Sequence, residues 1–496
     1  MFIEKVKSIK CGKINNNDPN LTAIMSKSLA IPPLCLKSMK KHWTIDGDIT
    51  TRVRSLEDTL ANITPICKKI GVTRICDITY LDRLYIPNYC SVLPGTEDSI
   101  WVYSGKGPTK IHAKVSALME SIERYCSLSS SWSKSPISGS YFELSKTYKI
   151  LHPDEVVEPV ESFYNDKCSI IDFIPGFDLL NEEELLVPAQ LVFSRYSSKH
   201  PSVDIFPYSH TNGLASGNVI EEAICQALCE VIERDAVSIA ELCASSIPYS
   251  VLEKITSSLK NTVQVGSAPD ISELDFVDDS SIFLDVNISE FADKFKPLKY
   301  LVRRFTDTGI SLLIKDITQK DIGIPTFVAS SVEWVSSNYG YFAYGYGTHL
   351  DSRVALIRAI TEMSQTRAVN IQGARDDCKK IEYKENDEIY KRKWQFKSAT
   401  PSRLRTSNKN TIQFSEIKSY IMDDILDDIK FILNCLKKAG FKRVIVVDLT
   451  HPELGIPVVR VIVPGLETFE VGRLFRNTEL IIGKRARESF RKFYDI

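Results

Sequence analysis

The sequence predicts an α/β (α+β) protein with an internal pseudo-repeat, in which long helices pack against short strands. The octapeptide from Ala117 to Arg124 returns as Ala227 to Arg234, with six of eight positions identical. Both copies carry glutamates three residues apart among Ala, Leu and Ile, which is the pattern of a helix half-buried in a core. Short alternating or apolar stretches with Gly- and Pro-containing turns lie between the helical segments and predict strands.

Composition places the chain among soluble globular proteins. Its 496 residues are 43% hydrophobic and 25% charged, enough for two or three domains or one two-lobed core. The net charge of -1 gives no electrostatic case for binding nucleic acid or an anionic membrane. No apolar run approaches the roughly 20 residues that span a bilayer, and the N-terminus lacks a signal-peptide pattern, so we expect a cytoplasmic protein.

The first half of the chain is expected to alternate helices, strands and small-residue loops. Residues up to about Asp48 resemble an irregular arm, because Asn- and Pro-rich turns interrupt them. Apolar residues at helical spacing predict a helix over 55–70, and alternation predicts a strand over 73–78. A strand over 100–103 leads through the loop 104–109 into the first-repeat helix. A mixed β region over 127–207 and the loop 209–218 precede the second-repeat helix.

The second half repeats this arrangement once more. The Gly-containing segment 345–350 precedes a third helix that begins near Asp351, in which residues 355–362 retain Ala, Leu and Ile of the octapeptide. Arg358 there replaces the first repeated glutamate. A polar connector follows from Arg375 to about Thr411. Periodicity then predicts a helix over 415–438 and strands over 443–448 and 457–463.

Ionisable residues lie on one face of each of the three helices. Residues three or four apart share a helical face, and carboxylates beside a buried stripe are costly unless a cation neutralises them. Such faces offer oxygen ligands for Mg²⁺ and guanidinium groups for phosphate. An ordinary solvated face with intrahelical ion pairs is the alternative. The three faces comprise Ser116, Glu120, Glu123 and Arg124; Glu222, Gln226, Glu230, Glu233 and Arg234; and Arg358, Glu362 and Gln365.

Two Gly-containing loops precede helices, where backbone N–H groups favour anions: Gly105 to Gly107 and Asn212 to Asn218. The P-loop pattern GxxxxGK[ST] is absent from the sequence. Twelve cysteines contain no CxxC pair, so we expect reduced, mostly buried thiols. A zinc or redox role for Cys225, Cys229 and Cys126 is the alternative, since the first two are one helical turn apart.

These motifs together resemble the YcaO family. The resemblance covers roughly Ser55 to Glu467, and it rests on the order and spacing of many short motifs. They are Thr79-x-Leu81-Asp82-Arg83-x3-Pro87, Gly105-Lys106-Gly107, Ser116-x3-Glu120-x2-Glu123-Arg124, Asn212-Gly213, Gly217-Asn218-x3-Glu222, Glu230-x2-Glu233-Arg234-Asp235-Ala236, Arg358-x3-Glu362-x2-Gln365-x-Arg367, Gly373-Ala374-Arg375, Asp448-Leu449-Thr450 and Val463-Pro464-Gly465-Leu466-Glu467.

The resemblance implies an ATP- and Mg²⁺-dependent enzyme that activates a peptide backbone amide by phosphorylating its oxygen, which yields an azoline, a thioamide or an amidine. It implies helices with a Mg-ATP site packed on β-sheets, and a homodimer. By position, the nucleotide would be bound by Lys106, Ser116, Arg124, Asn218, Glu230, Arg234 and Arg358. Mg²⁺ would be held by Glu120, Glu123, Glu222, Glu230, Glu233 and Glu362, and the catalytic residues stay open.

The same resemblance divides the chain into an arm over 1–54, a catalytic core over 55–395 and a part over 396–496 that completes the domain. Azoline-forming members typically end in a Pro-rich tail, and no proline follows Pro464 here. This favours thioamide formation on a peptide or protein, with a separate partner such as a TfuA-like sulfur-delivery protein or a leader-peptide-binding protein. The alternatives are an azoline-forming cyclodehydratase of modified-peptide biosynthesis, and a non-catalytic ATP-binding accessory factor, for example for a ribosomal-protein methylthiotransferase.

Overall fold

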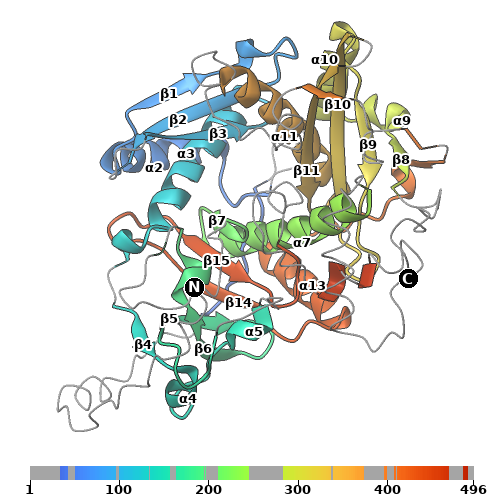
Figure 1. Ribbon diagram of the computed structural model, residues 1–496. Helices are drawn as coiled ribbons and strands as arrows, with labels where there is room; N and C mark the ends of the chain where they lie inside the picture. Colours follow the sequence, from blue (N-terminus) through green and yellow to red (C-terminus); the bar gives the residue numbers. More distant parts are fainter. Residues whose placement is uncertain are drawn as a thin grey trace, which may run out of the picture.

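Three sheets and the long helices between them form the described part of the protein (Figure 1). The computed structural model describes residues 34–42, 51–95, 100–132, 135–156, 164–194, 196, 211–244, 283–336, 339–373, 396–398, 407–408, 410–468, 484–486 and 488–489. The strands run antiparallel in all three sheets, except that β13 pairs with β8 in parallel. This mixture of helices and sheets confirms the predicted fold class.

Each sheet follows its own order. The first is antiparallel, in the order β1-β2-β3. The second has the order β12-β11-β10-β9-β8-β13, and the third β4-β5-β14-β15-β7, with β6 paired to β5. The strands are β1 (Arg74–Asp77), β2 (Asn88–Pro94), β3 (Ile100–Lys106), β4 (Ile137–Gly139), β5 (Ile171–Asp178), β6 (Glu183–Pro188), β7 (Leu214–Ser216), β8 (Asp285–Asn287), β9 (Leu313–Asp316), β10 (Thr326–Ser336), β11 (Tyr339–Thr348), β12 (Phe396–Ser398), β13 (Thr411–Gln413), β14 (Ile445–Asp448) and β15 (Val458–Ile462).

Side-chain caps define where several helices begin. The Ser55 hydroxyl accepts from the Asp58 N–H before α2, and Thr109 accepts from the His112 N–H before α3. Asp424 caps α13 by accepting from the Leu426 N–H. The helices are α2 (Leu56–Lys69), α3 (Lys110–Cys126), α4 (Tyr141–Leu144), α5 (Pro153–Val156), α6 (Ala189–Val192), α7 (Ile220–Ala244), α9 (Ser289–Ala292), α10 (Lys296–Thr308), α11 (Ser352–Gly373) and α13 (Ile425–Lys438).

Helix α7 lies across the middle of the molecule, with β14 and β15 below it and β10 and β11 above it in Figure 1. Its apolar residues are buried from one end to the other, as in Ala223, Leu228, Ile232 and Ala240. One hydrophobic core joins α7, α13 and β15, and a second joins α11 to β10 and β11. None of the described helices is both long enough and apolar enough to cross a membrane.

Glycines allow strands to lie directly on the helices that follow them. A Cβ atom at Gly105 of β3 would come within 2.1 Å of the Ala117 nitrogen of α3. One at Gly345 of β11 would come within 2.1 Å of the Met363 nitrogen of α11. Both glycines were predicted as loop residues, but they lie in strands. Glycine is required there because the helix backbone leaves no room for a side chain.

The remaining element predictions have mixed outcomes. The helices over 55–70 and in both repeats are confirmed, as are the strands over 73–78, 443–448 and 457–463. The helix predicted from 415 begins only at Ile425, because β13, a 3-10 turn and the Asp424 cap precede it. Of the arm before Asp48, residues 34–42 are described; Met39 and Lys41 pair through their backbones with α13 and its preceding residues. The turn at residues 15–20 lies outside the described residues. Of the connector predicted from Arg375 to about Thr411, the structure describes 396–398, 407–408 and 410–411, and Phe396–Ser398 form β12.

Candidate functional site

The ionisable faces of α3, α7 and α11 meet in one region between the sheets. Electrostatic interactions link Glu123 of α3 to Glu230 of α7, and Glu233 of α7 to Glu362 of α11. Two strand residues join them, Lys106 from β3 and Arg460 from β15. The predicted convergence of three helices is therefore what the structure shows.

The α3 side of the site combines two carboxylates with a guanidinium group. Arg124 donates from Nη2 to Glu120 Oε1 at 3.2 Å, and its Nε lies 3.8 Å from Glu123 Oε1. The pKa of Glu123 is raised well above its ordinary value by burial, against the opposing effect of Arg124, while Glu230 and Glu120 raise it further. Arg124 Nη1 is buried, and it makes no hydrogen bond among the described residues. This nitrogen points to an anionic ligand that would complete its hydrogen bonding.

A second pair of carboxylates, Glu233 of α7 and Glu362 of α11, have pKa values shifted in opposite directions. Glu362 of α11 is contacted by the Lys106 ammonium group and accepts from the Tyr346 N–H at 3.3 Å. Burial favours the neutral form of Glu362, but Lys106 and Arg234 outweigh it and lower its pKa. Glu233 is only 4% exposed. Burial and the neighbouring Glu362 raise its pKa to about 7, against the lowering effect of Arg358, Arg234 and Lys106.

Arginines surround the same carboxylates. Arg358 of α11 donates from Nη1 to Gln226 Oε1 of α7 at 2.5 Å, which connects the two helices directly. Burial raises the pKa of Glu230, against the lowering effect of Arg234, Arg124, Arg460 and Arg358. Gln365, one turn after Glu362, donates to the Ser104 carbonyl of β3. The site therefore alternates positive and negative side chains from all three helices.

Glu222 and Asn218 form a smaller group at the start of α7. Asn218 donates from Nδ2 to both oxygens of Glu222, at 3.1 and 3.2 Å. Arg52 donates to Glu222 Oε1 at 3.1 Å, and Thr59 of α2 donates to Asn218 Oδ1 at 3.1 Å. Glu222 and Asn218 thus already have hydrogen-bond partners. Ser116 is half-buried on α3, one turn before Glu120. We infer that the segment from Arg52 to Thr59 forms this edge of the site, which the sequence analysis missed.

Arg460 is a second residue that the sequence analysis missed. It is 2% exposed in the middle of β15, where burial lowers its pKa to about 10, against the raising effect of Glu230 and Glu123. Its Nε donates to the Leu191 carbonyl at 3.1 Å. The signal was present in the sequence: a single arginine interrupts the apolar strand Val458–Ile462. A charged residue in such a strand needs a buried counter-charge.

The chemistry of these residues fits a magnesium nucleotide. Burial raises the pKa of Glu123, Glu230 and Glu233 despite the cationic side chains around them, and a bound Mg²⁺ would favour their anions. The buried Arg124 Nη1 fits a phosphate oxygen. Among the described residues, no three His, Cys, Asp or Glu side chains are close enough to enclose a metal ion by themselves. In ATP sites, Mg²⁺ commonly binds one or two carboxylates together with phosphates and water.

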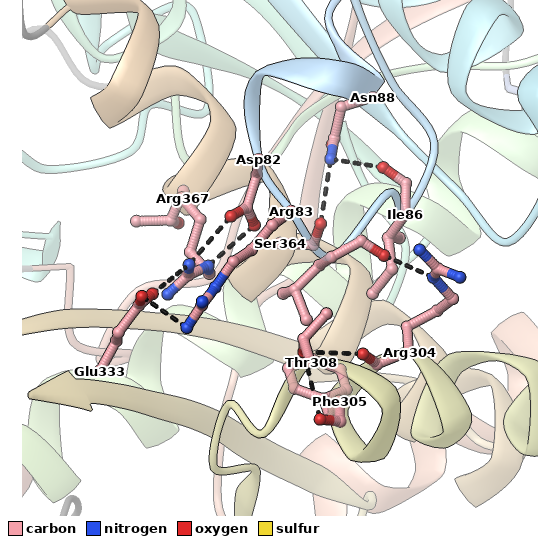
Figure 2. Close-up of polar contacts among 12 residues, drawn as sticks. Asp82, Arg83, Ile86, Asn88, Arg304, Phe305, Thr308, Glu333, Ser364 and Arg367 are labelled. Atoms are coloured by element: carbon pink, nitrogen blue, oxygen red, sulfur yellow. Dashed lines mark hydrogen bonds and ion pairs between the residues drawn. The ribbon is translucent and has the colours of Figure 1, made fainter.

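The Thr79–Pro87 motif contacts α11 and β10 through Asp82 and Arg83 (Figure 2). Arg367 of α11 binds both oxygens of Asp82, at 2.8 and 2.9 Å, and donates to Glu333 of β10 at 2.9 Å. Arg83 lies 2.6 Å from the other Glu333 oxygen. Asn88 also donates to Ser364 of α11 at 3.0 Å. This motif therefore joins the segment between β1 and β2 to α11 and to β10.

The cysteines singled out by the sequence are buried. Cys225 and Cys229 hydrogen-bond to each other on α7, and their mutual interaction and burial raise the pKa of Cys225 well above its ordinary value. Cys126, at the end of α3, is 1% exposed, and burial raises its pKa to about 12. All three are thus buried in the core.

Comparison with known proteins identifies the relatives of this chain. Residues 104–467 match the model of the YcaO cyclodehydratase family, described as binding ATP and Mg²⁺. An uncharacterized protein of Methanothermobacter thermautotrophicus is 33% identical over 410 residues, which are 81% of this chain and 91% of that protein. A Rhizobium leguminosarum bv. trifolii protein, named for the tfuA 3' region, is 28% identical over 85% of this chain and 90% of its own length.

Solved structures share the fold. A heterocyclase in complex with substrate and cofactor has a TM-score of 0.66 at 21% identity, over 88% of this chain. This chain spans only 54%, about half, of that heterocyclase chain. YcaO from Methanopyrus kandleri, bound with AMPPCP and Mg²⁺, has a TM-score of 0.54 at 22% identity, over 84% of this chain and 92% of that one. The family match over most of the chain, the shared fold and the convergent acidic and basic helix faces lead to one conclusion: this chain belongs to the YcaO family of ATP- and Mg²⁺-dependent amide-activating enzymes.

Proposed function

We propose that this protein converts a backbone amide of a peptide or protein into a thioamide. A hydrosulfide adds to the amide carbonyl carbon, and the resulting oxygen attacks the γ-phosphorus of ATP. ADP leaves, and phosphate then departs as the carbon–sulfur double bond forms. The overall reaction consumes an amide, hydrosulfide and ATP, and it yields a thioamide, ADP and phosphate.

The observation that carries the ATP-dependent part is a set of buried and half-buried carboxylates next to Arg124 Nη1, which is buried and has no hydrogen-bond partner among the described residues. Glu123, Glu230 and Glu233 would hold Mg²⁺, with Glu120, Glu222 and Glu362 as further candidates. Arg124, Arg234, Arg358 and Lys106 would neutralise the phosphates, with Ser116 and Asn218 at the edge of the site. Phosphoryl transfer needs positioning and neutralisation of charge, which these side chains supply.

The name of the relative from the tfuA 3' region supports thioamide formation over the other outcomes. That relative matches 85% of this chain and 90% of its own length. It also supports a TfuA-like protein as the sulfur-delivery partner. A second candidate, an azoline-forming cyclodehydratase, is favoured by the description of the family model. The accessory-factor alternative is disfavoured by the number of site residues that are present. The three-part domain division and the homodimer stay predictions.

The test uses purified protein with Mg-ATP and a test peptide that contains Gly, Cys, Ser and Thr, with or without sodium sulfide and a TfuA-like protein. Peptide mass distinguishes the products: oxygen-to-sulfur exchange supports a thioamide, while loss of water without sulfide identifies a cyclodehydratase and contradicts our preference. Glu123→Gln and Glu233→Gln should abolish ATP turnover. Glu241→Gln, an isosteric change about two turns beyond Glu233 on α7, is the matched control and should keep it.

A further inference from the structure

Two cysteines stand directly opposite each other in the first sheet. Cys76 of β1 pairs with Cys90 of β2, and the two side chains pack in one cluster. In the same register Ile78 donates its N–H to the Asn88 carbonyl at 2.9 Å, directly across. Hydrogen-bonded pairs alternate along an antiparallel ladder, so Cys76 and Cys90 form the next such pair. Their Cα atoms are then about 5.5 Å apart, which is a separation that disulfides accept.

This pair lies on the sheet face that carries the ATP-site lysine. Cys90 pairs across with Ser104, and Asn88 pairs with Lys106, so alternation directs Cys90, Ser104 and Lys106 to one face. Helix α11 covers that face: Cys90 packs against Ala368, and Lys106 contacts Glu362. The opposite face packs on α3, where Ser91 donates to the Ala117 carbonyl. The thiol pair and Lys106 thus lie on the same face of the first sheet, between that sheet and α11.

The two thiols differ in exposure. Cys90 is 1% exposed, and burial together with the neighbouring Cys76 raises its pKa. Cys76 is half-buried, with the exposed Arg74 on the same face of β1. Gln372, an exposed residue near the end of α11, places its Nε2 3.9 Å from the Cys90 sulfur. Cys76 is therefore the thiol that a small donor reaches first, and Cys90 is the buried thiol behind it.

We propose that Cys76 and Cys90 act as a dithiol that receives sulfane sulfur from a persulfide donor and releases it as hydrosulfide beside the ATP site. This rests on the proposed thioamide function, for which hydrosulfide is the nucleophile. Cys76 attacks the outer sulfur of a persulfide RSSH, which gives Cys76–SSH and RSH. Cys90 then attacks the inner sulfur of Cys76–SSH, and its proton goes to the departing sulfur.

The products of the second step are a Cys76–Cys90 disulfide and hydrogen sulfide. The dithiol is oxidised by two electrons, and the sulfane sulfur is reduced to sulfide. A thiol reductant R′SH then restores the dithiol by two exchange steps that produce R′SSR′. The half-buried position of Cys76 and the adjacent resolving thiol suit this sequence, since attack within a preformed pair needs no second encounter.

The experiment measures hydrosulfide release from cysteine persulfide by the fully reduced protein, without added thiol, ATP or peptide. Wild-type protein should release hydrosulfide in proportion to protein, up to one equivalent each, and peptide mapping should find the Cys76–Cys90 disulfide. Cys90→Ser should retain the persulfide on Cys76, and the initial rate should fall about tenfold or more because resolution becomes bimolecular. Cys76→Ser should lower the initial rate of hydrosulfide release by the same factor. Cys435→Ser changes a half-buried thiol on α13 and is the matched control.

Release by the Cys76→Ser/Cys90→Ser double variant at the wild-type rate, or no Cys76–Cys90 disulfide in the treated wild-type protein, would overturn the proposal. The disulfide map needs no variant, so it holds even if a serine variant fails to fold. Failure of the proposed function is seen separately, with sodium sulfide supplied directly. If wild-type protein forms no thioamide under that condition, thioamide formation is wrong although the dithiol chemistry stands.

Discussion

At the scale of single residues, two neighbouring carboxylates of the site have pKa values shifted in opposite directions. Lys106, which contacts Glu362, and Arg234 lower the pKa of Glu362. Burial and Glu362 raise the pKa of Glu233 to about 7, against the lowering effect of Arg358, Arg234 and Lys106. Two like charges in a low-dielectric site destabilise each other, and we expect Mg²⁺ to offset this repulsion.

This asymmetry predicts how stability depends on pH in the absence of metal. The folded-state pKa of Glu233 lies above its ordinary 4.5, so between about pH 4.5 and 7 the folded protein binds a proton that the unfolded chain has released. That stabilisation is complete below about pH 4.5 and is lost as pH rises through about 7. At pH 8 in EDTA, Glu233→Gln should therefore raise the free energy of unfolding, by on the order of 1–3 kcal/mol. Urea denaturation at pH 5 and pH 8 measures it; an equal effect at both values would contradict the assignment.

At the scale of elements, a strand packed directly on the following helix recurs at β3–α3 and β11–α11. Gly105 and Gly345 each have a helix backbone about 2 Å from where a Cβ would lie, at Ala117 of α3 and at Met363 of α11. This contact brings Lys106 and Tyr346 close to the ionisable helix faces. The third helix, which keeps three of the eight octapeptide positions, therefore lies against the strand that precedes it, as the first-repeat helix does.

Alanine at these glycines should separate the strand from its helix. We expect Gly105→Ala and Gly345→Ala each to lower the free energy of unfolding by about 3 kcal/mol or more, since the neighbouring atoms belong to the backbone and cannot move aside alone. Gly323→Ala is the comparison: nothing lies within 4 Å of its Cβ position, and its φ of 72° costs about 1 kcal/mol. Equal losses for all three variants in urea denaturation would argue against backbone contact as the cause.

At the scale of the whole molecule, the site lies where helices from three sheets meet. Helix α3 packs on the first sheet and shares a core with the third, α11 packs on the second, and α7 packs on β15 of the third. A magnesium nucleotide bound between them would therefore stabilise all three layers together.

Binding should accordingly raise the stability of the whole protein. With Mg²⁺ and a non-hydrolysable ATP analogue at 100 times the dissociation constant, the free energy of unfolding should rise by about 2.7 kcal/mol. Thermal unfolding measures the gain. Either component alone should give a smaller rise, and Glu230→Gln should reduce the combined effect while Glu241→Gln keeps it. A full rise with the analogue in EDTA would separate the carboxylates from nucleotide binding.

Local sequence information was sufficient for most elements and for the acidic helix faces. Spacings of three and four place Glu120 with Glu123 and Glu230 with Glu233 on one face whatever else the chain does, because helix geometry is local. The repeat also placed the faces of α3 and α7 in equivalent settings. Local sequence information was insufficient where a segment is compatible with both a loop and a strand. Gly105 and Gly345 were therefore predicted as loop residues, although they belong to strands.

Only the tertiary structure decided which distant residues meet. Arg52 reaches Glu222 across 170 positions, Lys106 reaches Glu362 across 256, and Cys76 faces Cys90 through strand register. Arg460 enters the site because β15 lies between the helices, not because of its neighbours in sequence. Helical periodicity determines which side chains share a face, but charge compensation depends on distances between faces, and packing of the layers alone establishes those distances.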